Sequence, residues 1–70
     1  MRRQYSVYMR SSGTSSFFWV LQFWAMDAAH ALRMTARYWQ DEATAKLRHM
    51  YELDDAYAVL EGYEPRNPGL

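Results

Sequence analysis

The first 25 residues show the hydrophobic and polar pattern of two consecutive β-strands. In residues 4–10, Tyr5, Val7 and Met9 recur on one face at a period of two, which predicts a strand. A small polar segment follows at residues 11–14. It contains a glycine, which tolerates positive φ, so we expect a turn there and a second strand beyond it.

The second predicted strand, residues 15–25, is hydrophobic on both of its faces. One face would carry Phe17, Trp19, Leu21 and Phe23, and the other would carry Phe18, Val20 and Trp24. Gln22 is its only polar member after the serines that open it. A strand without a polar face is usually buried on both sides, so we expect this strand to be central in its sheet.

An amphipathic helix is predicted for residues 28–40. Asp27 precedes it and is a favoured N-cap residue, because its carboxylate accepts a free backbone N–H of the first turn. The segment is rich in alanine and lacks glycine and proline. The positions expected to face the sheet are Ala28, Ala31, Leu32, Thr35 and Trp39.

Alternation resumes in residues 46–53 and predicts a third strand. Asp54 and Asp55 would then form a two-residue turn into a last strand over residues 56–63. In that hairpin Arg48 would lie opposite Glu61, a favourable pair of charges. The alternative for the last segment is a short helix with Asp54 as N-cap and a glycine just beyond its end.

These elements predict an α+β fold with the order ββαββ. Four mainly antiparallel strands would form one sheet, with the helix packed on one face. Residues 1–63 would make a single domain, and residues 64–70 a flexible C-terminal tail.

One helix covers only one face of such a sheet, so we expect the other face to bind a partner. Trp, Tyr, Met and Arg are the residue types enriched at interface hot spots. The predicted partner-binding residues are Tyr8, Arg10, Phe18, Val20, Trp24, Arg48, Met50 and Tyr57. The alternative is that the sheet curls and that the long hairpin or the tail shelters Phe18 and Trp24.

Residue composition argues against most catalytic and metal chemistry. Cysteine is absent, and the two histidines, His30 and His49, have no second ligand at a standard metal spacing. The sequence has neither a phosphate-binding glycine loop nor a nucleophile motif. We therefore expect no metal, no cofactor and no enzymatic activity.

The distribution of charge and hydropathy leaves a cytoplasmic protein as the expectation. Net charge is zero, with an excess of basic residues in residues 1–40 and of acidic residues in residues 52–70. Arg2 and Arg3 ahead of an apolar run resemble a signal peptide, but the polar residues 11–16 interrupt it. The run is also too short to cross a membrane, so we expect no membrane partner.

A non-enzymatic protein-binding module is the function that these features predict. Aromatic residues make up 17% of the chain and suit an interface, and a homodimer through the sheet face is the simplest form. Small, neutral, cysteine-free domains of this kind are common among phage and mobile-element accessory proteins. Some of those, such as anti-CRISPR proteins, inhibit a larger host complex by occluding its surface; the analogy is one of size and style.

Two other functions remain open. The aromatic and arginine residues of an open sheet face suit a single-stranded nucleic-acid-binding domain. A structural subunit of a larger assembly is the third possibility.

Overall fold

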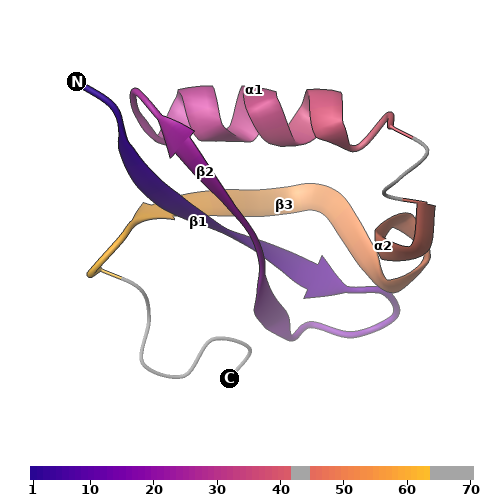
Figure 1. Ribbon diagram of the computed structural model, residues 1–70. Helices are drawn as coiled ribbons and strands as arrows, with labels where there is room; N and C mark the ends of the chain where they lie inside the picture. Colours follow the sequence, from indigo (N-terminus) through magenta and orange to yellow (C-terminus); the bar gives the residue numbers. More distant parts are fainter. Residues whose placement is uncertain (42–44, 64–70) are drawn as a thin grey trace.

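A computed structural model describes residues 1–41 and 45–63 of the chain, so the predicted tail at residues 64–70 lies outside the described residues. The fold is α+β, as the sequence predicts, with three strands and two helices within the described residues (Figure 1). In chain order the elements are β1 (Arg3–Ser11), β2 (Phe17–Ala25), α1 (Ala28–Tyr38), α2 (Ala45–Met50) and β3 (Tyr51–Leu60).

The three strands form one antiparallel sheet in the order β2-β1-β3. The central strand is therefore β1, and its residues 6–9 are all buried. The prediction that the doubly apolar strand β2 is central was wrong, because β2 pairs only with β1 and forms an edge. After the α1 crossover, β3 joins the side of β1 that the first hairpin leaves open.

A one-residue bulge in β2 changes which of its side chains share a face. Val7 pairs with Leu21, whereas Tyr8 pairs with Trp19, so Val20 is an extra residue without a partner on β1. Because side chains alternate along a strand, the bulge reverses the predicted faces before residue 20. Trp19 thus shares a face with Tyr8, and Phe18 lies on the opposite face.

The second half of the chain differs from the predicted hairpin. Residues 45–50 form helix α2, and β3 starts only at Tyr51. Periodicity is ambiguous over so few residues, and Ala, Lys, Leu, Arg and Met are all good helix formers. The predicted pair of Arg48 with Glu61 does not form: the Arg48 guanidinium instead donates to the backbone carbonyls of Trp39 and Asp41, at 2.6 and 2.9 Å.

Asp54 and Asp55 lie within β3 rather than in a turn. The strand pairs with β1 on both sides of them, with Glu52 opposite Arg10 and Tyr57 opposite Tyr8. Residues 53–56 lie opposite Met9 alone and form a large bulge. A tight hairpin turn of the favoured type needs positive φ at both central residues, and here only Asp55 has it, at 68°. One strand therefore replaces the predicted two, and the alternative of a helix over this segment is wrong as well.

Helix α1 covers one face of the sheet, as predicted (Figure 1). The Asp27 carboxylate caps it by accepting the backbone N–H of His30 at 2.7 Å. Ala31 and Thr35 of the helix are buried, and its Tyr38 ring meets Phe23 of β2 edge-on at 6.1 Å between centroids. The molecule measures 35 × 29 × 15 Å, the thickness of one helix layer on one sheet layer.

Candidate binding surface

The sheet face turned away from α1 is called the open face here. Its membership follows from the strand register, because directly paired residues point to the same side of a sheet. Phe23, which contacts α1, pairs with Tyr5, so the odd-numbered residues of β1 face the helix. The open face then comprises Gln4, Ser6, Tyr8, Arg10, Phe17, Trp19, Gln22, Trp24, Glu52, Tyr57 and Val59.

A compact group of three rings fills the centre of the open face. Tyr8 and Tyr57 stack with a centroid distance of 5.3 Å and an interplanar angle of 8°. Phe17 reaches across β1 to meet Tyr57 at 5.6 Å. Together they leave Tyr8 only 1% exposed. The three rings thus cover one another, whereas Phe18 and Trp24, the residues that the alternative expected to be sheltered, are 43% and 55% exposed.

Two tryptophans of β2 remain uncovered beside this group. Trp19 and Trp24 are each 55% exposed on the open face. The Trp19 indole N–H donates to the backbone carbonyl of Leu21 at 3.0 Å, which satisfies its polar atom within the strand. The ring is therefore held in place with its hydrophobic surface toward solvent, an arrangement typical of interface anchors.

Only half of the predicted partner-binding residues lie together on this face. Tyr8, Arg10, Trp24 and Tyr57 do. Phe18, 43% exposed, lies on the helix side of the sheet, where it meets Tyr51 edge-on at 6.5 Å. Val20 is the unpaired bulge residue, and Arg48 and Met50 belong to α2.

Phe17 and Trp19 lie on the open face, although the sequence pattern predicts them on the helix side of the sheet. Both precede the bulge in β2, and both would face the helix if the strand alternated regularly. Neither was among the predicted partner-binding residues, because no local feature of the sequence reveals the extra residue.

Charge on the open face is sparse and largely paired. The Arg10 guanidinium Nε lies 3.8 Å from the Asp55 carboxylate, and Arg10 pairs across the strands with Glu52. Arg10 is the only basic residue that the register assigns to this face among the described residues. The Arg2 guanidinium donates to the Trp24 backbone carbonyl at 3.2 Å, so the surface is hydrophobic around Trp19 and carries a positive charge next to Trp24.

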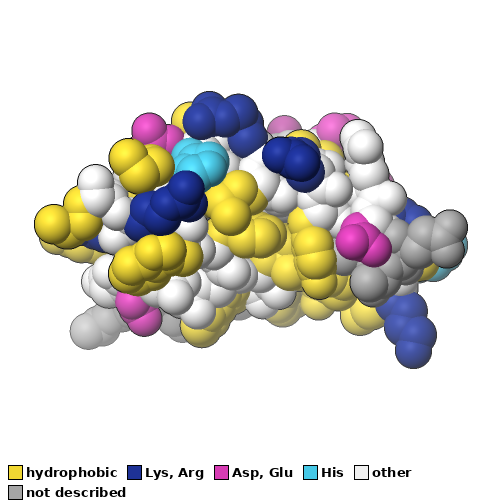
Figure 2. All heavy atoms as spheres, turned by 45° about the horizontal axis from the view of Figure 1, so that its top comes forward, with side chains coloured by type: hydrophobic (Ala, Val, Ile, Leu, Met, Phe, Trp, Pro, Cys, Tyr) yellow, Lys and Arg dark blue, Asp and Glu magenta, His cyan; other side chains and the backbone are white. Residues whose placement is uncertain are grey.

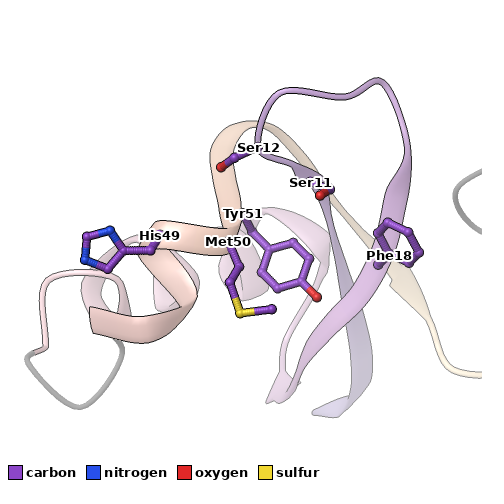
Figure 3. Close-up of a pocket in the computed structure, with 6 residues that line it drawn as sticks. All are labelled: Ser11, Ser12, Phe18, His49, Met50 and Tyr51. Carbon is purple, nitrogen blue, oxygen red and sulfur yellow. The ribbon is translucent and has the colours of Figure 1, made fainter.

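A hollow of about 420 Å³ lies where the end of β1 and the start of β2 meet the junction of α2 and β3 (Figure 3). There the backbone N–H of Ser12 donates to the Met50 carbonyl at 2.9 Å. Figure 3 shows the His49 ring directed away from Ser11 and Ser12, so no serine–histidine pair of the kind that activates a nucleophile is assembled. Within the described residues, no cluster of three or more His, Asp or Glu side chains is placed to hold a metal ion.

Comparison with known proteins gives no family. No family model matches the chain, and neither a curated protein nor a solved structure is significantly similar to it. Among the described residues, none of the helices has the length and hydrophobicity that crossing a bilayer requires.

Proposed function

We propose that this protein is a non-enzymatic module that binds another protein through its open face. The observation that carries the proposal is the pair Trp19 and Trp24, each more than half exposed on one side of an uncharged strand. Large exposed rings on one face, here on either side of Gln22, are costly in water and mark a surface that another molecule covers.

The geometry favours a rigid docking surface over a flexible one. Trp19 is fixed by its hydrogen bond to the Leu21 carbonyl, and the Tyr8–Tyr57 stack supports the adjoining sheet. A preordered surface loses little conformational entropy on binding, which favours affinity. A flat domain that binds through one face blocks the part of its partner that it covers. We therefore extend the proposal to inhibition of a larger complex by occlusion of its surface.

A protein partner fits this face better than single-stranded nucleic acid. Nucleic-acid binding needs cations along the backbone path, and Arg10 is engaged by Asp55 beside the acidic Glu52. Arg48, the other arginine predicted for this face, lies on α2 and donates to backbone carbonyls. The Arg2 guanidinium, which donates to the Trp24 carbonyl at 3.2 Å, adds a cation at one end of β2, so the face offers stacking rings with little positive charge along them.

Affinity capture with matched variants tests the proposal. The tagged wild type, the double variant Trp19→Ala, Trp24→Ala and the control Met50→Ala would each be used to capture proteins from a lysate of the source organism. Met50 is 54% exposed, like the tryptophans, but it lies on α2. We expect a partner that the wild type and Met50→Ala retain and the tryptophan variant loses.

Capture of the same partners in equal amounts by all three proteins would show that the open face is not the docking site. Loss with Met50→Ala alone would move the site to the hollow next to α2. Circular dichroism of each variant separates loss of binding from loss of folding.

A further inference from the structure

The two edges of the sheet differ in how they are protected against pairing with another strand. β3 carries Glu52, Asp54 and Asp55 and a large bulge, features that natural proteins use to prevent edge-to-edge association. β2 has nine residues without a charge or a proline. Its outer side lies beside no other strand of the described residues, and the Arg2 guanidinium, which donates to the Trp24 carbonyl at 3.2 Å, places a charge against one end of the strand.

Large hydrophobic side chains are exposed on both faces of β2. Trp19 and Trp24 point to the open face, whereas Phe18 is exposed on the helix side. A partner lying flat on the open face would cover the tryptophans and leave Phe18 in water. A partner that extends the sheet beyond β2 reaches both faces at once.

The helix side of β2 is also incompletely covered. A hollow of about 390 Å³ lies between α1 and β2, lined by Phe23, Met34, Arg37 and Tyr38. Figure 2 shows basic side chains along the helix and a band of hydrophobic side chains directly below it, on the side where β2 lies in Figure 1. The hydrophobic pattern of β2 is that of a central strand, yet it occupies an edge.

We propose that β2 pairs antiparallel with β2 of a second copy of this chain, so that three strands from each copy form one sheet of six. In that dimer β2 becomes a central strand, as its sequence pattern requires. The proposal rests on the backbone edge and its flanking rings, and it stands whether or not a different protein binds the open face.

A second copy is the occupant that the chemistry of this edge favours. An antiparallel strand pairs with itself about a two-fold axis, so each copy offers the same surface and the association closes as a dimer. Identical strands bring identical charges together, and β2 has none to repel. Leu21–Ala25 follows the bulge as the longest regular stretch, and pairing would start there.

The two-fold axis of such a pair runs perpendicular to the sheet, which fixes where the other features lie. Both α1 helices fall on one side of the joined sheet and both open faces on the other. Trp19 and Trp24 of each copy would then line the seam. Dimerisation would thus double the aromatic surface.

The area that the β2 edge can bury determines how strong the dimer is expected to be. A nine-residue strand is roughly 30 Å long. At a molecular thickness of 15 Å the joined edges cover at most about 450 Å² per copy, or about 900 Å² in total. That area is typical of weak, reversible association, so the dimer should dissociate on dilution through the micromolar range.

Sedimentation velocity over a dilution series tests this dimer. Gln22→Lys places an ammonium group on the edge of each copy, and Gln22 is exposed, so the change removes no core contact. Gln40→Lys makes the same substitution at an exposed site just beyond α1. We expect wild type and Gln40→Lys to dimerise with the same dissociation constant, and Gln22→Lys to bind itself at least tenfold more weakly.

Hydrogen exchange of the wild type gives an independent measurement that needs no variant. Amide protection in β2 should rise with protein concentration while protection in β3 stays constant. A wild type that remains monomeric up to roughly 1 mM, well above the range expected for such an interface, would overturn the proposal. So would Gln22→Lys dimerising like the control, or concentration-dependent protection in β3 instead of β2.

Discussion

Tyr57 covers Tyr8 on the open face, and this contact shows how single side chains replace a missing second layer. The two rings are nearly parallel, and the Phe17 ring contacts Tyr57. The open face is in this way partly buried by its own residues, and the exposed hydrophobic surface is shifted toward β2.

We expect Tyr57→Ala to destabilise the protein by about 2 kcal/mol, because it removes a half-buried ring and uncovers Tyr8. Tyr57→Phe keeps the stack and should cost less than about 0.5 kcal/mol. Urea unfolding followed by tryptophan fluorescence measures both. Equal stability of the two variants would show that the stacked rings contribute little.

At the residue scale the sequence identified the right kinds of side chain but not all of their positions. Tyr8, Trp24 and Tyr57 were predicted for the open face and lie on it. Phe18 and Trp19 exchanged faces because the Val20 bulge reverses the alternation. A bulge depends on how two strands fit together, so a pattern within one strand does not show it.

At the scale of elements, the Asp54–Asp55 bulge is the feature that turns two predicted strands into one. Asp55 adopts the left-handed conformation, which Asp and Asn tolerate better than most residues, and its carboxylate also lies near Arg10. Either the backbone conformation or the ion pair with Arg10 would explain why an aspartate stands at this position. The ion pair is 3.8 Å long and Asp55 is exposed, so we expect it to contribute little.

Two substitutions of Asp55 separate these contributions. Asp55→Asn removes the charge but keeps the tolerance for positive φ, and it should leave stability within about 0.5 kcal/mol of wild type. Asp55→Ala should cost about 1 kcal/mol, because alanine is strained at φ 68°. Chemical denaturation measures both, and a loss with Asn as large as that with Ala would give the ion pair the dominant role.

The start of α1 provides an element that the sequence predicted correctly. Asp27 was expected as N-cap, and its carboxylate accepts the His30 backbone N–H. Asp27→Ala should therefore cost about 1 kcal/mol, whereas Asp27→Ser, which retains a capping oxygen, should cost only a few tenths. Thermal unfolding of the two variants checks this, and an equal loss would show that another contact holds the helix start.

Local signals explain which elements were predictable. β1, β2 and α1 have long periodic patterns and a clear turn or cap between them. Residues 45–60 have short alternations that fit a strand or a helix, and α2 is only six residues long. The conformation of these residues depends on the pairing of β3 with the free side of β1, and that pairing is a long-range tertiary contact.

The whole molecule has a small core for its size. Only five hydrophobic residues of the described chain are fully buried: Val7, Tyr8, Met9, Ala25 and Ala31. A domain this small has a thin stability margin and usually gains from disulfides, a metal or association. Disulfides are impossible without cysteine, so association is the route that the exposed edge of β2 supports.

Self-association linked to folding makes the melting temperature depend on protein concentration. A species that binds only the folded state stabilises it by an amount that grows with the logarithm of its concentration above the dissociation constant. For a domain of this length each 1 kcal/mol corresponds to roughly 4–8 °C, so we expect a rise of several degrees between low and high micromolar concentrations. Differential scanning calorimetry measures the shift directly.

Gln22→Lys supplies the decisive comparison for this temperature shift. Its melting temperature at low concentration should equal that of wild type, because Gln22 is exposed and the monomer is unchanged. At high concentration it should stay constant while wild type and Gln40→Lys rise together. A parallel rise in all three proteins would mean that they associate through a surface other than the β2 edge, because the added charge would have blocked pairing there.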